Sequence, residues 1–243
     1  MSELLESVKS GAAFLGVCFL IFAALVILAI LAQRLICKDM PNRHGARYVA
    51  YVAMFSAIAG VLMLFDIPLF FAPSFYKIDL SEIPVLICTF YLGPVAGVIT
   101  EFLKNLLKIL MKGTTTAFVG DFANFVIGCS MVLPASIIYH CRHSRKNALI
   151  GLITGTLVMT VFGSLFNAVY LLPKFSELYG MPLESIVAMG TAVNGHITSV
   201  ETLVLYAVVP FNLLKGLIVT AAVFFLYKRL SPLLSRGQYR KTK

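Results

Sequence analysis

Long stretches without an acidic or basic residue recur along the chain and predict helices that cross a membrane. Such stretches cover residues 10–33, 48–65, 83–100, 122–141 and 147–173, while residues 202–227 contain a single charge, Lys215. About 20 apolar residues in a helix span the ~30 Å hydrocarbon core of a bilayer. Gly93-Pro94 interrupts the third stretch, and a proline disfavours helix at the residue before it. We therefore predict seven spans: 11–33, 47–65, 82–92, 94–112, 121–140, 147–172 and 202–228.

Lysine and arginine are distributed unevenly over the predicted loops, and this bias predicts the orientation. Thirteen of them lie in residues 34–47, 141–146 and the tail from 228, whereas four lie on the other side. Seven spans place all three basic segments on one face, so we predict an outside N-terminus and an inside C-terminus. The leading segment carries Glu3 and Glu6, unlike the basic start of a signal peptide, so we predict that the first helix is retained.

The composition is typical of a membrane protein and argues against a soluble, nucleic-acid-binding, disulfide-rich or metal-binding protein. The chain is 59% hydrophobic and 13% charged, whereas soluble domains are roughly 45–50% apolar and about 25% charged. We attribute the net charge of +9 to the loop bias rather than to nucleic-acid binding. The five cysteines form no CxxC pair and the four histidines show no ligand-like spacing, so no disulfide framework and no metal site are predicted.

Catalytic and nucleotide-binding motifs are absent from the sequence. It contains no GxxxxGK[ST], GxSxG or HExxH, so we predict neither an ATPase nor another enzyme, and no cofactor. A membrane enzyme that uses Glu101 or Asp121 as an acid or base remains an alternative. No convincing inverted repeat is present, which weakens the case for a self-contained transporter.

Polar residues inside predicted spans are candidates for a binding site, because such groups are expensive in lipid. Asn212 and Lys215 are three residues apart and share a helix face, and Asn167 lies near the outer end of its span. An asparagine amide suits a ligand with an imide or amide edge. The alternative is hydrogen bonding between helices. A stripe that begins with Glu101 and Lys104 in span 94–112 either contacts a ligand or forms structural ion pairs.

Two outer loops and one helix face also stand out. The loop 66–81 is rich in aromatic residues, among them Phe75 and Tyr76, and is predicted to be a lid over a flat apolar ligand or an interfacial anchor. The loop 113–120 is predicted to offer hydroxyls to a polyol, and Asp121 after it is alternatively a helix N-cap. Small residues align along the second predicted span and favour close helix approach: Ala46, Ala50, Ala53, Ala57 and Gly60.

Six segments in this order resemble one family: YKIDLSEIPVL, FYLGPVAGV, EFLKNLL, GDFANFVIG, SLFNAVYLLP and PFNLLKG. Together they resemble the S component of an energy-coupling factor (ECF) vitamin transporter, most closely the riboflavin-binding members. The resemblance covers residues 46–230 and implies a six-helix core with an outward-facing vitamin site. It also implies a plasma-membrane location and an energising module of one membrane scaffold subunit and two ATPases, which fits the missing P-loop.

The resemblance further implies roles for particular residues. Riboflavin, as transported ligand, would be bound by Asn167, Asn212, Lys215, Tyr76, Phe75, Asp79, Lys104, Thr114 and Thr115. The scaffold subunit would dock on Ala46, Ala50, Ala53 and Ala57. The chain then divides into an extra N-terminal helix and linker (1–40), the six-helix all-α binding domain (41–230) and a basic tail (231–243). The remaining alternatives are an S component for thiamine, biotin or a folate, and a stand-alone permease.

Overall fold

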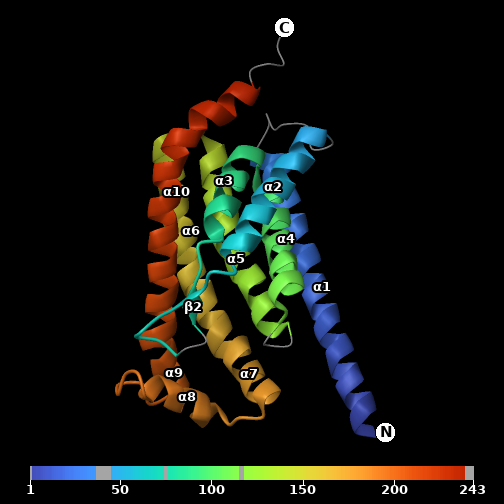
Figure 1. Ribbon diagram of the computed structural model, residues 1–243, viewed down its shortest axis with the longest axis vertical. Coiled ribbons are helices and arrows are strands. Elements are labelled where there is room, and N and C mark those ends of the chain that lie inside the picture. The colour runs from blue at the N-terminus through green and yellow to red at the C-terminus, as the bar shows by residue number, and fades with distance from the viewer. Residues whose placement is uncertain (1, 37–44, 74–75, 115–117, 239–243) are drawn as a thin grey trace.

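The computed structural model describes residues 2–36, 45–73, 76–114 and 118–238, most of them in helices (Figure 1). The elements are α1 (Ser2–Ile36), α2 (Ala46–Leu62), β1 (Ile67–Pro68), β2 (Lys77–Ile78), α3 (Glu82–Leu92), α4 (Pro94–Lys112), α5 (Val119–Cys141), α6 (Arg145–Phe166), η1 (Asn167–Leu171), α7 (Leu172–Tyr179), α8 (Leu183–Thr191), α9 (Val200–Leu203), η2 (Val204–Val208) and α10 (Val209–Gln238). The two strands pair antiparallel within the loop between α2 and α3.

The short helix α3 forms the centre of the bundle. Nine of its eleven residues are buried, and α2, α4, α5 and α10 surround it. Next to it, α5 and α6 approach closely because α6 carries Gly151 and Gly155 at the contact. A Cβ atom at Gly155 would lie 2.5 Å from the Met131 carbonyl oxygen, so only glycine permits this spacing.

The predicted break at Gly93 is confirmed. α3 ends at Leu92 and α4 begins at Pro94, with Gly93 at φ 97°, a conformation that favours glycine. Two further irregularities were not predicted. The π-helical turns η1 and η2 each end two residues before a proline, Pro173 and Pro210, which lack the N–H needed for an α-helical bond. The helix predicted over 147–172 therefore continues through η1 into α7.

The N-terminal helix α1 lies against α4 and α5 on the outside of the bundle (Figure 1). The Phe22 ring packs on Phe102 with ring centroids 4.7 Å apart, and the buried Gln33 accepts a hydrogen bond from the Val95 amide at 3.4 Å. α1 is thus joined to the bundle by contacts to its core helices. The face of α2 that carries Ala46, Ala50, Ala53 and Ala57 is exposed.

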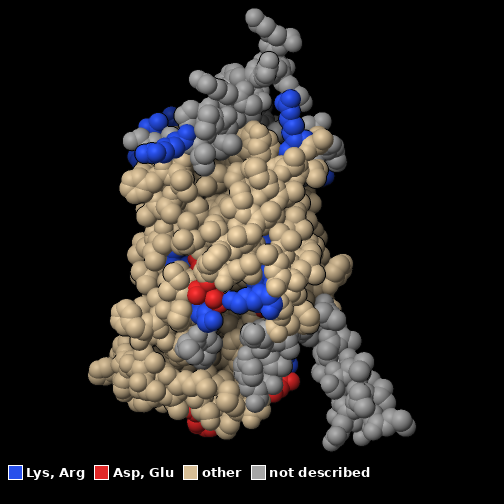
Figure 2. All heavy atoms as spheres, in the orientation of Figure 1, with Lys and Arg blue, Asp and Glu red and all other residues tan. Residues whose placement is uncertain are grey.

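Within the described residues, four helical segments are long and apolar enough to cross a membrane: Gly16–Ile36, Val119–Cys141, Arg145–Glu177 and Val200–Tyr227. α2 and α3 are apolar but shorter, and α4 carries four charged residues. The seven-span topology and its orientation stay predictions. Figure 2 shows basic side chains gathered at the end of the molecule nearest the C-terminus, beyond a broad band without charge.

Candidate functional site

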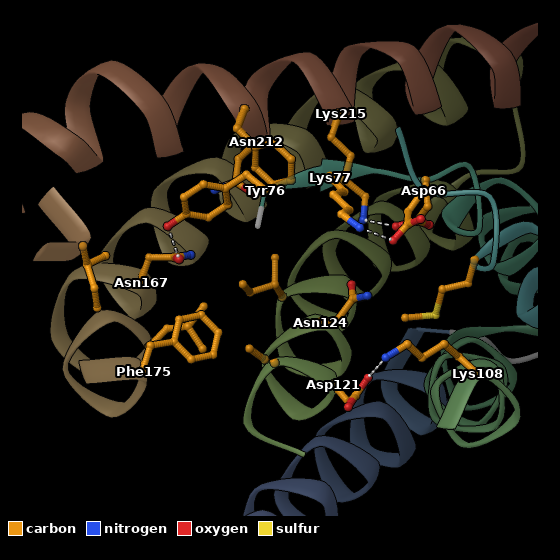
Figure 3. Close-up of a pocket in the computed structure, with 18 of the residues that line it drawn as sticks. Asp66, Tyr76, Lys77, Lys108, Asp121, Asn124, Asn167, Phe175, Asn212 and Lys215 are labelled. Atoms are coloured by element: carbon orange, nitrogen blue, oxygen red, sulfur yellow. Dashed lines mark hydrogen bonds and ion pairs between the residues drawn. The ribbon is translucent and has the colours of Figure 1, made fainter. Parts of the chain in front are cut away.

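A cavity of about 530 Å³ opens between the loop after α2, the helices α4, α5 and α10, and the segment from η1 to α8. Pockets of roughly 300–1,000 Å³ hold small organic ligands. One end of the cavity is apolar and is lined by Leu171, Phe175, Met181, Ile186, Met189 and Phe211. The opposite end is charged and includes Asp66, Lys77, Lys108 and Asp121 (Figure 3).

Side-chain amides form part of the cavity wall. Tyr76 donates a hydrogen bond to Asn167 Oδ1 at 2.9 Å, and Asn167 Nδ2 donates to the Gly163 carbonyl at 2.7 Å. Burial of Tyr76 raises the pKa of its hydroxyl, which therefore stays protonated and remains a donor. Asn212 Nδ2 is buried and has no hydrogen-bond partner among the described residues. A buried amide N–H without a partner destabilises the protein. A ligand oxygen that accepted a hydrogen bond from Asn212 would remove this cost and bind more tightly.

Lys215 and Asp79 form an ion pair at the cavity wall, with Nζ and Oδ2 3.2 Å apart. Burial raises the pKa of Asp79, but the charges of Lys215 and Lys104 and hydrogen bonds from Ser81 outweigh it, and the pKa falls to about 2. Asp79 is thus ionised at neutral pH. It holds the ammonium group one helical turn from Asn212, so an amide and a cation face the cavity together.

Further buried charged side chains lie behind the Lys215–Asp79 pair, on the side away from the cavity. Lys104 Nζ lies 2.6 Å from Glu82 Oε1 and 2.7 Å from Glu101 Oε1, and Lys215 lies 3.7 Å from the same Glu82 oxygen. These five side chains contact one another in the order Glu101, Lys104, Glu82, Lys215 and Asp79, and we call them the buried ion chain. Each of these side chains is at most 9% exposed. Both Glu101 oxygens lack a geometrically good hydrogen bond among the described residues.

Two ion-paired groups form the charged end of the cavity, and we call them the mouth pairs. Lys108 lies 2.5 Å from Asp121, while Lys77 and Lys112 each lie 3.1 Å from an oxygen of Asp66. Slight burial raises the pKa of Asp66, but the hydrogen bonds and charges of the two lysines lower it overall. The helix α5 begins at Val119, with Phe118 at the N-cap position and Asp121 inside the first turn, so the alternative that Asp121 is an N-cap is wrong.

The structure brings five of the predicted ligand residues to one cavity: Tyr76, Asp79, Asn167, Asn212 and Lys215. Two others do not line it. Lys104 lies in the buried ion chain, which supports the ion-pair alternative for its helix, and the Thr114 hydroxyl accepts a hydrogen bond from the Phe118 amide at 3.0 Å. Phe75 and Thr115 lie outside the described residues.

Sequence reasoning missed the apolar end of the cavity. Phe175 follows the turn η1, and Ile186 and Met189 belong to α8, which lies in a segment predicted only as a loop. The available signal was Pro182 followed by Leu183, Ile186 and Val187 at helical spacing. Among the described residues, no group of three His, Cys, Asp or Glu side chains could hold a metal ion.

Comparison with known proteins gives consistent matches over most of the chain. A family model described as "ECF transporter, substrate-specific component" matches residues 47–227. The riboflavin transporter RibU of Staphylococcus aureus (strain TCH60) is 38% identical over 195 residues, which are 80% of this chain and 96% of that protein. The riboflavin transporter FmnP of Bacillus subtilis (strain 168) is 33% identical over 182 residues, 74% and 90% of the two chains. A solved structure described as "Structure and mechanism of the S component of a bacterial ECF transporter" aligns with a TM-score of 0.61 at 36% identity and covers 77% of this chain and 97% of that chain.

Proposed function

The chain belongs to the family of substrate-specific components of ECF transporters, and on that premise we propose that it binds riboflavin for uptake across the cell membrane. This family provides the substrate-binding membrane subunit rather than an enzyme. The observation that carries the proposal is the cavity, in which apolar walls lie beside Asn167, Asn212 and Lys215. Similarity to riboflavin transporters over most of the chain supports the same ligand.

The cavity suits the three parts of a flavin. The isoalloxazine ring is flat and largely apolar, and Phe175, Phe211 and the methionines offer it walls of matching character. The imide edge of the ring carries two carbonyl oxygens and an N–H. Asn212 Nδ2 and Lys215 supply donors to the carbonyls, while an asparagine oxygen can accept the N–H. The ribityl hydroxyls then lie toward Asn124 and the mouth pairs.

We further propose the topology and partners that this role requires. With the N-terminus outside, the cavity lies on the outer half of a seven-span chain. The exposed alanine face of α2 is our proposed docking surface for a membrane scaffold subunit, which two ATPases would energise. α1 packs on α4 and α5, so it leaves this face open. Residues 1–40 are then an addition to a six-helix binding domain over 41–230, followed by a basic tail.

The absorbance and fluorescence of the detergent-purified chain test the ligand directly. We expect a flavin absorbance band in the purified protein and fluorescence that increases when denaturation releases the ligand. Asn212→Ala should weaken riboflavin binding by about tenfold, since it leaves a ligand acceptor without its donor. Asn147→Ala is the matched control, because Asn147 bonds the Ile138 carbonyl and does not line the cavity.

A colourless protein that also fails to quench the fluorescence of added riboflavin would refute the flavin assignment. The family assignment would stand in that case, and thiamine, biotin and folates would be the ligands to test. Uptake by the chain in vesicles that lack any ATPase would instead favour a stand-alone permease.

A further inference from the structure

Two helical segments that border the cavity contain a π-helical turn at the same distance from a proline. The turns η1 and η2 each end two residues before a proline, Pro173 in the first case and Pro210 in the second. The residue in between closes the turn by donating its N–H to the carbonyl five positions back, rather than four as in an α-helix. The two turns contact each other. Neither proline lines the cavity, so any effect on a ligand must pass through the helices.

Proline disfavours the α-helical alternative at both places. In an α-helix the N–H of each residue bonds the carbonyl four positions back, which belongs to Val169 for position 173 and to Tyr206 for position 210. A proline has no N–H, and its ring clashes with that carbonyl. Proline alone does not require a wider turn, however, because α5 stays α-helical through Pro134. The register of the two helices gives the further reason.

The extra residue in each turn keeps buried side chains on one side of the helix. Leu203 and Asn212 are nine positions apart across η2, and both are buried. Nine residues make about two and a half turns of an α-helix, so an unbroken helix would place the two side chains on opposite faces. Gly163 and Leu172 have the same spacing across η1 and are also buried. The wider turn absorbs one residue and brings both members of each pair back toward the bundle.

The residues beside these turns are the ones that face the proposed ligand. Asn167 is the first residue of η1, and Phe175, beyond the same turn, lines the same cavity (Figure 3). Asn212 follows Pro210 by two residues and lies close to α6, because a Cβ atom at Gly163 would be 3.1 Å from its Nδ2. A change of register by one residue rotates a helix by about 100°, which would turn the Asn212 amide out of the cavity.

We propose that Pro173 and Pro210 are positioning residues for riboflavin, because they favour the π-helical turns that direct the amides of Asn167 and Asn212 into the cavity. The inference rests on the proposed function and deepens it by adding two residues that do not line the site. Pro173 is exposed and Pro210 is half-buried, so their side chains contribute little to the core. Their contribution to binding is the path of the backbone.

Riboflavin dissociation constants and melting temperatures of the full chain in detergent separate positioning from folding. Pro173→Ala and Pro210→Ala should each weaken riboflavin binding by about tenfold. Neither should lower the melting temperature of the ligand-free chain, because alanine supplies the missing N–H and favours helix. A proline needed only for folding would change both quantities together.

A double-mutant cycle tests whether Pro210 acts through Asn212. In the Asn212→Ala chain the amide is already absent, so the addition of Pro210→Ala should weaken binding by less than about threefold. Pro134→Ala is the matched control. Pro134 lies inside α5 without a π-helical turn and does not line the cavity, so the dissociation constant should not change.

Several outcomes would overturn the inference while leaving the proposed function intact. Unchanged riboflavin affinity in both proline variants would do so, as would an equal loss in Pro134→Ala or a further tenfold loss when Pro210→Ala is added to Asn212→Ala. A melting temperature lowered together with the affinity in both variants would assign the prolines to folding alone. Failure of the unaltered chain to bind riboflavin would overturn the proposed function as well.

Discussion

Replacement of Lys104 by methionine should destabilise the protein strongly while leaving the cavity lining intact. The Lys104 ammonium group is fully buried, with Glu82 at 2.6 Å and Glu101 at 2.7 Å. Methionine has a similar length but no charge, so three carboxylates, Asp79, Glu82 and Glu101, would remain buried with one ammonium group, Lys215. Removal of one partner from a buried ion pair costs about 3–5 kcal/mol. For a chain of this size, that free energy corresponds to a melting temperature lower by about 6–20 °C.

The buried cysteines provide the assay. Cys88 and Cys129 are 0% exposed, so a thiol-reactive fluorescent dye reaches them only when the bundle opens. Cys141 is exposed and reacts at once, which sets the baseline. The temperature at which the signal increases above this baseline reports unfolding in detergent. Riboflavin should be left out of this measurement, since a bound ligand increases apparent stability.

The matched variant is Glu101→Gln, alone and combined with Lys104→Met. The buried ion chain contains three carboxylates, Asp79, Glu82 and Glu101, but two ammonium groups, Lys104 and Lys215, so it has one surplus negative charge. Glu101→Gln removes this surplus and should lower the melting temperature much less than Lys104→Met does. The double variant should be more stable than Lys104→Met alone, as coupled partners require. If Glu101→Gln lowered the melting temperature as much as Lys104→Met does, the surplus negative charge would not explain the difference, and the reasoning would be refuted.

Three other features of the molecule can be tested by substitution or truncation. Asp79 has a pKa of about 2, below its ordinary value of 3.8, so its contribution to stability is present above about pH 4 and is lost as the pH falls toward 2; thermal unfolding of Asp79→Asn should lack this acid-dependent step. Gly155→Ala should lower the melting temperature because its Cβ would meet the Met131 carbonyl, whereas Gly16→Ala, with nothing within 4 Å, should not. Removal of residues 1–40 should leave the riboflavin dissociation constant within about threefold, since α1 does not line the cavity.

Local sequence signals predicted where most helices begin and end. Gly93-Pro94 predicted the break between α3 and α4 to the residue, because a glycine with positive φ and a proline act within their own turn. The effect of two other prolines on their helices was not predicted. Pro173 and Pro210 each follow a π-helical turn by one intervening residue; Asn167 begins the first turn, and Asn212 lies in α10 shortly after the second. Proline marks such a position, but the sequence alone does not tell whether the helix ends, kinks or widens there.

The binding site could be predicted as a set of residue types but not as a set of partners. Asn167, Asn212 and Lys215 were found because polar groups are rare inside apolar spans. Which acid pairs with which lysine depends on contacts between residues far apart in sequence, such as Lys215 and Asp79, which are 136 positions apart. Lys104 was therefore included among the ligand residues, although its stripe left ligand contact and ion pairing both open. Its neighbour Glu82 looked like an ordinary residue of a helix start and was not singled out.

The charges of the site balance only when both of its parts are counted together. The buried ion chain has one carboxylate in excess, and the mouth pairs have one lysine in excess, so the whole set contains five lysines and five carboxylates. Net charge removed from water is costly, so this balance lets Lys215 face a neutral ligand without leaving the whole set of groups with an uncompensated charge. The two parts should therefore be separable by mutation. Asp66→Asn, at the partly exposed mouth, should lower the melting temperature much less than Lys104→Met does, because an exposed ion pair contributes less to stability than a buried one. An equal decrease in the two variants would show that the division between a buried, stabilising chain and an exposed mouth is wrong.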